Sequence, residues 1–319
     1  MASEVVSISY EDLISSPHSL SGSIVQKRHS GLVQNVLGLS SKLLKLSYEF
    51  AHLEESVREK YADARSRYSF GWSHGKEIMN GKPDVLKGSF YANPVVDDPD
   101  VAAELREEYP EYYNRNIWPK ADEAGVEGYE QAFKQLGGFI FEVGCALATA
   151  CEAFATPHLN VSISNLIKES STAKARLLHY FPPPTADSGR HPAMNPILTG
   201  LCSAMYLREG ASGPEIVPSP SESSGLYIRT RGGTLTKVSI PTDCLAFQTG
   251  EALEVATGLS LRATPHCVRV GMGSGTDKIS RETLAVFMQP NVDQQLSDKL
   301  SFGQFSKQVF SEHYEDESK

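Results

Sequence analysis

The chain has 319 residues, of which 40% are hydrophobic and 22% are charged. This composition is ordinary for a globular protein and argues against a disordered chain, a collagen-like repeat or a coiled coil. Its 30 Lys and Arg against 39 Asp and Glu give a formal net charge of −9, so we expect no nucleic-acid partner. No stretch approaches the length of apolar sequence that spans a membrane, so we expect no membrane segment.

The cysteines and the N-terminal residues indicate the cellular compartment in which we expect the protein. The five cysteines form no C-x-x-C pair, and one is left over if the others pair. Reduced thiols are therefore expected rather than a disulfide framework. The first residues carry acidic side chains and lack an apolar run of signal-peptide length, so we expect a cytoplasmic protein.

The first half of the chain predicts mainly helices. Residues 5–10 alternate in a way that is typical of a short strand. From Ser40 onward, apolar residues recur at three- and four-residue steps, which predicts an amphipathic helix. Residues 68–94 are too irregular for a helix and favour loops and short strands. A second, largely apolar helix is expected over about 121–154.

The second half changes character after Pro157. Short β-prone segments alternate with Gly, Pro and Ser turns, which favours a sandwich or barrel over a doubly wound nucleotide-binding fold. Residues 231–233 predict a hairpin turn. We therefore expect an α+β chain with a helical region at 1–154, a β domain at 155–300 and a tail at 301–319. The expected strands are 175–181, 198–207, 225–230, 235–240, 244–248, 263–270 and 283–289.

Several motifs occur in a fixed order along the chain. They are S-F-Y-A-N-P at 89–94, N-I-W-P at 116–119, a long block from Gly225 to Val270 that contains G-E and L-E pairs before His266, and R-E-T at 281–283. Together they resemble the isopenicillin N synthase-like family of non-haem iron(II) oxygenases, which includes many 2-oxoglutarate-dependent enzymes. The resemblance implies a double-stranded β-helix, or jelly roll, with a helical N-terminal half.

The resemblance also implies a site. His266 matches the family's distal iron histidine, and Fe(II) in such enzymes needs two imidazoles and one carboxylate on one face of an octahedron. Arg281 and Thr283 match the pair that holds a carboxylate, either of 2-oxoglutarate or of the substrate. Arg67 and Tyr68 lie where family members contact their substrate. The partners implied are O₂ and a small-molecule substrate.

The proximal iron motif departs from the family pattern. Where the family has G-W-H-x-D-H-G before a strand similar to L-T-G-L, this chain has G-R-H-P-A-M-N-P-I. Aligned on Gly189, His191 takes the histidine place and Ala193 the aspartate place. Aligned without a gap on Leu198, both ligand places are apolar. Asp187 is an alternative carboxylate. Phe181 also replaces the tyrosine of the family's N-x-Y, which weakens the expectation of 2-oxoglutarate.

Two classes of function follow. The first is an Fe(II)-dependent oxidase or oxygenase of a small molecule, with His266 and His191 on the metal and 2-oxoglutarate as a candidate cosubstrate. The alternative is a member that binds a ligand without catalysis, or a halogenase-like enzyme, because an H-x-Ala arrangement resembles the iron-dependent halogenases. The substrate and the oligomeric state have no signal in the sequence.

Overall fold

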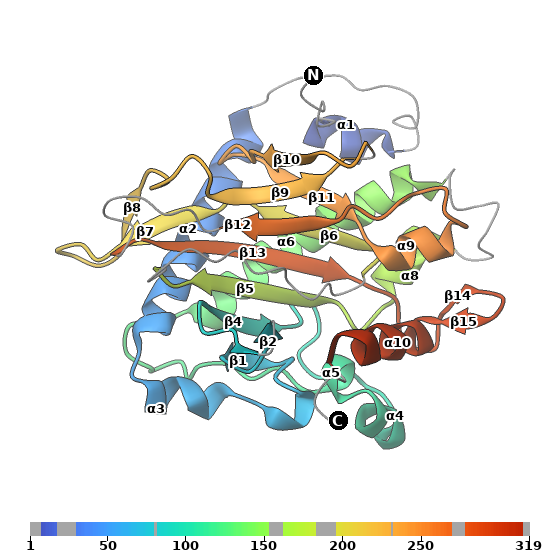
Figure 1. Cartoon of the computed structure of the whole chain (residues 1–319), viewed down its shortest axis with the longest axis horizontal. Coiled ribbons are helices and arrows are strands. Elements are labelled where there is room, and N and C mark those ends of the chain that lie inside the picture. Colours follow the sequence, from blue (N-terminus) through green and yellow to red (C-terminus); the bar gives the residue numbers. More distant parts are fainter. Residues whose placement is uncertain are drawn as a thin grey trace.

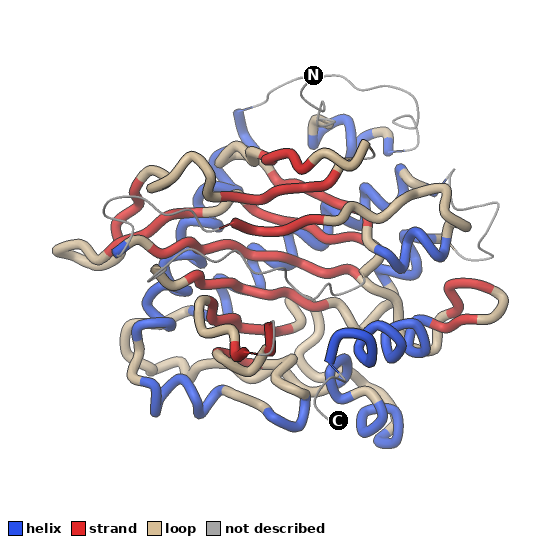
Figure 2. The backbone as a smooth tube through the Cα atoms, viewed as in Figure 1, coloured by secondary structure: helices blue, strands red, loops and turns tan. Residues whose placement is uncertain are grey.

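The computed structural model describes residues 8–17, 30–79, 82–152, 162–182, 196–230, 232–269 and 278–314. Its centre is a large antiparallel sheet with a smaller sheet across one of its faces and long helices on the other (Figure 1). Figure 2 shows the strands gathered in the middle of the molecule with helices around them. The helical and strand-rich halves of the sequence therefore build one layered structure.

The large sheet has eight strands. Its main path runs β1 (Gly71–His74), β4 (Lys87–Ala92), β5 (Lys174–Tyr180), β13 (Ser280–Met288), β6 (Leu198–Cys202) and β11 (Leu245–Thr249). Off this path, β7 (Met205–Arg208) pairs with β13 and with β8 (Glu215–Val217). All pairings are antiparallel, and the central pair sets Arg281 opposite Tyr180 and Thr283 opposite Leu178. Since side chains alternate along a strand, this register places Arg281, Thr283, Leu178 and Tyr180 on one face.

The small sheet has the order β10 (Leu235–Val238), β9 (Gly225–Arg229) and β12 (His266–Arg269). The predicted hairpin joins β9 to β10. Thr230 N donates to Thr234 O at 2.9 Å, and Gly233 adopts a φ of +81°, which only glycine reaches without strain. Two short hairpins lie elsewhere, β2 (Ile78–Met79) with β3 (Lys82–Pro83) and β14 (Gln295–Ser297) with β15 (Leu300–Ser301).

Two long helices, α2 (Ser30–His52) and α6 (Tyr129–Ala150), pack on the face of the large sheet that is turned away from the small sheet. Shorter helices border the sheets. They are α1 (Tyr10–Ser15), α3 (Glu55–Arg58), α4 (Ala103–Glu108), α5 (Pro110–Tyr113), α8 (Ile163–Lys168), α9 (Glu251–Ala256) and α10 (Phe302–Tyr314), with 3₁₀ turns at Glu59–Tyr61 and Ala64–Ser66.

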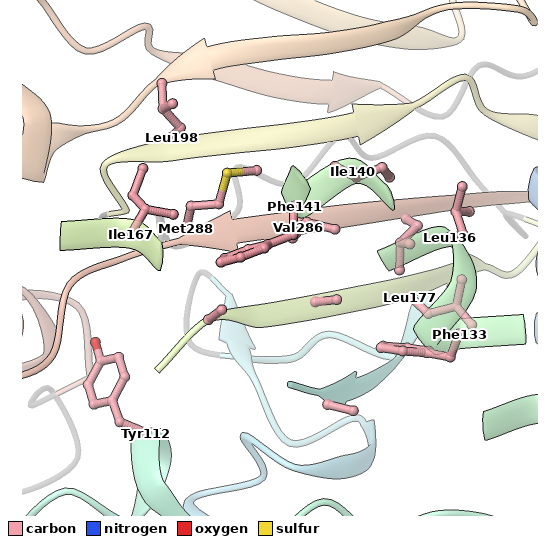
Figure 3. Packing of buried hydrophobic residues seen from close by; sticks show 14 of the residues in the cluster. Tyr112, Phe133, Leu136, Ile140, Phe141, Ile167, Leu177, Leu198, Val286 and Met288 are labelled. Atoms are coloured by element: carbon pink, nitrogen blue, oxygen red, sulfur yellow. The ribbon is translucent and has the colours of Figure 1, made fainter. Parts of the chain in front are cut away.

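The hydrophobic core lies between α6 and the large sheet, where apolar side chains of both interdigitate (Figure 3). Glycines allow the close approach. A Cβ on Gly144 of α6 would lie 2.1 Å from Met288 Sδ, and a Cβ on Gly200 of β6 would lie 2.4 Å from Ile140 Cγ2. Larger residues at these positions would force the helix off the sheet.

The structure corrects some expected elements. Tyr10 begins α1 instead of ending a strand, because Ser9 Oγ accepts a hydrogen bond from Asp12 N at 3.1 Å and caps the helix. Residues 5–7 lie outside the described residues. Helix α2 begins at residue 30 rather than near Ser40, since the buried stripe already includes Val36 and Leu39.

The region after residue 300 also differs from the expected tail. It forms α10, whose Phe302, Phe305 and Ser306 are buried at helical spacing. Residues 311–314 belong to this helix. The N-terminal half likewise contributes more than helices, because β1 and β4 extend the large sheet. Among the described residues, no helix combines the length and apolar character needed to cross a membrane.

Candidate functional site

A cavity of about 570 Å³ lies between the two sheets. Alternate residues of the large sheet form one wall, and β9, β10 and β12 form the other. Its lining comprises Arg176, Leu178, Tyr180, Pro196, Thr199, Leu201, Cys202, Leu226, Arg229, Leu235, Ile240, Gln248, Thr249, Gly250, Glu251, Ala263, Thr264, Pro265, His266, Cys267, Val268, Arg281, Thr283, Ala285 and Phe287. This mixture of apolar walls and a few polar groups is typical of a small-molecule site.

Two buried arginines line this cavity, and their surroundings differ. Arg176 on β5 is held by protein groups, since its Nη2 lies 2.6 Å from Glu77 Oε1 and its Nε donates to Ser89 Oγ at 3.0 Å. Arg281 on β13 is only 6% exposed, yet its Nε and Nη1 have no hydrogen-bond partner. No carboxylate among the described residues forms an ion pair with it. The cavity therefore contains a buried guanidinium with unsatisfied donors.

Two tyrosines, Tyr180 and Tyr206, neighbour Arg281. The guanidinium lies over the ring of Tyr180, 5.2 Å from its centroid. Burial alone would raise the pKa of Tyr206, but hydrogen bonds from Ser219 and Ser224 and the neighbouring Arg281 charge outweigh it, so that pKa is lowered. Thr283 Oγ1 donates to the carbonyl of Cys202 at 3.3 Å, and Thr283 is one of the residues that line the cavity.

His266 lies across the cavity from β13, at the start of β12. Its Nδ1 is 3.1 Å from Thr264 O, so this nitrogen carries the proton and Nε2 presents its lone pair. His266 is exposed, but neighbouring atoms desolvate its ring in part, and this desolvation lowers its pKa below the usual 6.5. A neutral imidazole whose Nε2 is unprotonated is the form that binds a metal.

The donor set around His266 is incomplete within the part of the chain that the structure describes. Gln248 Nε2 lies 3.1 Å from His266 Nε2. Glu251 is the acidic residue among the lining residues, and no cluster of three or more His, Cys, Asp or Glu that could hold a metal occurs in the described ranges. The predicted second imidazole, His191, lies outside those ranges, as do Asp187 and Ala193.

The predicted substrate residues are not brought to this cavity. Arg67 and Tyr68 form a turn in which both have left-handed backbone angles, with φ of 54° and 57°. Arg67 Nη1 lies 4.0 Å from Glu111 Oε1, and the ring of Tyr68 lies under Lys76 Nζ at 5.3 Å. Neither side chain is among the lining residues. Their predicted role remains a prediction.

Two of the sequence motifs meet in a structural contact. Asn116 of N-I-W-P accepts from Asn93 N through its Oδ1 and donates to Asn93 O through its Nδ2, both at 2.8 Å. Asn93 belongs to S-F-Y-A-N-P, and its own Oδ1 accepts from Val95 N and Val96 N. These residues fix the chain after β4 and stay away from the cavity.

The opposite face of β13 carries a second polar cluster. Glu282 is fully buried there, 2.7 Å from His179 Nδ1, although the angle of this contact lies outside the hydrogen-bonding range. Its two oxygens accept from Ser47 Oγ at 2.9 Å and Ser280 Oγ at 2.8 Å. The carboxylate therefore has protein partners on the helix side of the sheet.

Arg176, Tyr180 and Gln248 are among the cavity residues that were not identified from the sequence. Period-two alternation on the predicted strand at 175–181 would have placed Arg176 and Tyr180 on one face. For Gln248 no local signal exists, because its contact with His266 joins strands of different sheets. Phe181, by contrast, packs against His179 with ring centroids 4.4 Å apart and is not a lining residue.

Comparison with known proteins shows which solved structures share this fold. No protein-family model matches the sequence, and no curated protein matches it significantly. Solved structures do match. A candidate 2OG-Fe(II) oxygenase family protein from Caulobacter crescentus has a TM-score of 0.67 at 17% identity, over 96% of this chain and 98% of that one.

Two further structures agree with this match. A candidate oxygenase from Shewanella oneidensis has a TM-score of 0.60 at 15% identity over 98% of both chains. A dioxygenase for auxin oxidation from Arabidopsis thaliana, in a binary complex with 2-oxoglutarate, has a TM-score of 0.52 at 15% identity over 82% of both chains. The protein therefore has the mixed helix and antiparallel-sheet fold of 2OG-Fe(II) oxygenase structures.

Proposed function

We propose that this protein is a 2-oxoglutarate- and Fe(II)-dependent oxygenase of a small molecule, with a jelly roll at residues 155–300. The observation that carries the proposal is Arg281, a buried cation that lines the cavity and has unsatisfied N–H donors. The neighbouring Thr283 hydroxyl completes a pair suited to a carboxylate. 2-Oxoglutarate is a dicarboxylate, and the Arabidopsis dioxygenase structure of similar fold contains it.

Energetics favour a ligand at Arg281. Burying a cation without a counter-charge costs several kcal/mol even after relaxation of the protein. A planar guanidinium binds a carboxylate through two parallel hydrogen bonds, which offsets this cost. Arg176 shows how the same wall satisfies an arginine that has a structural role, through Glu77 and Ser89.

The metal would lie at the other wall. His266 would hold it through Nε2, and His191 is the second imidazole by resemblance. Fe(II) bound there would supply the activation of O₂. Thr264 O fixes the tautomer of His266, and the lowered pKa of this imidazole keeps it neutral at pH 7. The apolar residues of both walls exclude water around the substrate.

The donor set near His266 favours a second candidate, a protein that binds the carboxylate ligand without turnover. The described cavity lining contains one imidazole, His266, and no aspartate, while the proximal motif lies outside the described residues and has Ala193 in the motif-aligned place of the aspartate. A halogenase-like enzyme is a related possibility. In such an enzyme a halide would occupy the coordination position that the family's aspartate carboxylate normally takes. Metal affinity separates these candidates from the leading one.

The test is an anaerobic titration of the purified protein with Fe(II), with and without 2-oxoglutarate. We expect a weak visible charge-transfer band that needs both components, because the keto acid chelates the metal through its C1 carboxylate and C2 carbonyl. Succinate, which lacks the keto group, is the matched control and should give no band. His266→Ala should abolish the band.

Two results would redirect the proposal. If 2-oxoglutarate binds in calorimetry while Fe(II) does not bind, the protein is a ligand-binding member without catalysis. If neither ligand binds, the proposed function is wrong.

We also propose a cytoplasmic location. The structure describes all five cysteines, and none of them forms a disulfide, which suits a reducing compartment. Fractionation of cells that produce the protein would test this location, and recovery of the protein from an oxidising compartment with paired cysteines would contradict it.

A further inference from the structure

Arg281 lies in one row with two tyrosines across three strands of the large sheet. Strand β13 sets Arg281 directly opposite Tyr180 of β5 on one side and directly opposite Tyr206 of β7 on the other. Directly opposed residues of antiparallel strands have Cβ atoms about 5 Å apart and point to the same face. The two tyrosines therefore flank the guanidinium, one on each side.

The two tyrosines contact the guanidinium in different ways. The ring of Tyr180 lies beneath it, 5.2 Å from Arg281 Cζ, and Tyr180 lines the cavity. Tyr206 is not a lining residue, and its hydroxyl interacts with the Arg281 side chain both as a hydrogen-bond partner and through the arginine charge. Because Nε and Nη1 of Arg281 have no partner, the contact with Tyr206 leaves these two nitrogens for a ligand.

The hydrogen bonds of Tyr206 determine which atom it offers to Arg281. Tyr206 Oη lies 2.9 Å from Ser224 Oγ, and Ser224 Oγ donates to the backbone carbonyl of Arg269 at 3.4 Å. A hydroxyl has one proton. Since the proton of Ser224 goes to Arg269, the neutral phenol of Tyr206 donates to Ser224. The lone pairs of the phenol oxygen then remain for the N–H groups of Arg281.

We propose that Tyr206 is a positioning residue for ligand binding: its phenol oxygen accepts from the Arg281 guanidinium and orients it so that Nε and Nη1 face the bound carboxylate. This inference rests on the proposed function and deepens it. Ser224 is only 2% exposed, and the hydrogen bonds end at Arg269, the last residue of β12. They therefore connect Arg281 to the strand of the small sheet on which His266 lies.

The charge of the phenol decides whether this contact favours a ligand. A neutral phenol orients the guanidinium without neutralising it, whereas a phenolate would pair with Arg281 and compete with the carboxylate of the ligand. Burial raises the pKa of Tyr206, but hydrogen bonds with nearby serines and the Arg281 charge outweigh it and lower this pKa below the usual 10. Burial raises the pKa of Tyr180 and of Cys202, which also lie beside Arg281. Ligand binding should therefore weaken at alkaline pH because Tyr206 ionises.

Other charges near Tyr206 do not face it in the described part of the chain. Across β8 it lies opposite Val217. The next pair along these strands, Arg208 with Glu215, is exposed and forms its own ion pair. Glu282 of β13 points to the helix face, where α2 packs. Arg281 is therefore the charge with which the ionised phenol would pair.

The experiment measures binding of 2-oxoglutarate and of succinate by calorimetry, from neutral to alkaline pH. At neutral pH, Tyr206→Phe should bind 2-oxoglutarate roughly tenfold more weakly, because the guanidinium loses the acceptor that orients it. At alkaline pH the affinity of the unaltered chain should fall, whereas that of Tyr206→Phe should stay level. A purely structural role would lower the affinity by one factor at every pH. Tyr10→Phe, which alters a tyrosine of α1 beside Phe139, is the matched control and should behave as the unaltered chain does.

A second measurement tests the contact without any ligand. The near-ultraviolet absorbance of tyrosinate follows the ionisation of tyrosines directly. Tyr206→Phe should remove a step that lies below the usual tyrosine range, and Arg281→Met should move this step to higher pH because a neighbouring positive charge is lost. An unchanged titration in Arg281→Met would show that the phenol does not contact the guanidinium, and the inference would fail even if Tyr206→Phe did not fold.

The binding results separate this inference from the proposed function. If 2-oxoglutarate binds the unaltered chain and Tyr206→Phe with equal affinity at every pH, the inference fails and the proposed function stands. If succinate binds in a way that depends on Tyr206 while 2-oxoglutarate does not bind, the proposed function fails and the inference stands. If the unaltered chain binds neither dicarboxylate, both fail.

Discussion

The two faces of β13 handle charge in opposite ways. Glu282 points to the helix face, where it is fully buried and has His179, Ser47 and Ser280 as partners. Arg281, its neighbour in sequence, points into the cavity, where two of its nitrogens have no partner. Both side chains are charged and buried, and they belong to one strand.

This difference separates a structural charge from a ligand-binding one. A charge whose partners are all protein groups is satisfied within the fold and contributes to its stability. A charge whose donors face a cavity is satisfied only by a ligand, and the fold bears the desolvation cost until the ligand binds. Variants on the two faces should therefore affect different measurements.

The largest effect is expected from the helix face. Glu282→Ala removes one partner of the buried contact with His179 and leaves the hydroxyls of Ser47 and Ser280 without their acceptor, so the free energy of unfolding should fall by about 3–5 kcal/mol. Urea denaturation would measure this loss. The folded fraction should still bind 2-oxoglutarate with unchanged affinity. A stable variant that has lost 2-oxoglutarate binding would reverse the assignment of the two faces.

The cavity face should show the converse. Arg281→Met removes the cation but keeps most of the volume, so affinity for 2-oxoglutarate should fall at least a hundredfold, or about 2.7 kcal/mol. Stability should stay the same or rise, because an unpaired buried charge is removed. Calorimetry and denaturation would measure the two quantities. Arg208→Met, which alters an exposed arginine paired with Glu215, is the matched control, and unchanged affinity in Arg281→Met would refute the proposed role of Arg281 in binding the carboxylate.

Lys174 on β5 extends the comparison to a buried amine whose hydrogen-bond acceptors are neutral backbone carbonyls. Its Nζ donates to the carbonyls of Ser69 and Glu111, and burial lowers its pKa from 10.5 to about 7, with the Glu111 charge opposing the shift. Between these two pKa values the unfolded chain binds a proton that the folded chain has released. Stability should therefore rise with pH from 7 to 9, by up to about 1.4 kcal/mol per pH unit.

The measurement is denaturation at several pH values for the unaltered chain and Lys174→Met. The variant lacks this titrating group, so its curve should lack the rise that the lysine contributes. Parallel curves for the two proteins would mean that Lys174 keeps its charge when folded.

The smallest effect concerns Thr283. Its hydroxyl already bonds to Cys202 O, so a bound carboxylate must compete with that carbonyl for the proton. Thr283→Val should then weaken 2-oxoglutarate binding by roughly fivefold, or about 1 kcal/mol, with Thr283→Ser close to the unaltered chain. Calorimetry would distinguish the two variants. If Thr283→Val lost as much 2-oxoglutarate affinity as Arg281→Met, the hydroxyl would contribute as much to binding as the guanidinium does.

The sequence determined much of the β half. Strands were predicted near β5, β6, β9, β10, β11, β12 and β13 because their short β-prone runs are separated by turn residues, and local propensity and sheet pairing agree there. The last strand was predicted to begin at residue 283, whereas β13 begins at Ser280, so that period-two alternation sets Arg281 and Thr283 on one face. The order of motifs indicated the fold of 2OG-Fe(II) oxygenase structures.

Tertiary structure decided what local patterns leave open. Helix α2, which carries Val36 and Leu39, packs against α6, β13 and β5, and α10 gained its register by burying Phe302 and Phe305. Asn93 and Asn116, 23 residues apart, form a reciprocal pair because the chain turns back after β4. The contact of Gln248 with His266 needs both sheets to be in place. Sequence determines which side chains a strand presents to a face, whereas the packing of the two sheets determines which faces meet and which charges remain for a ligand.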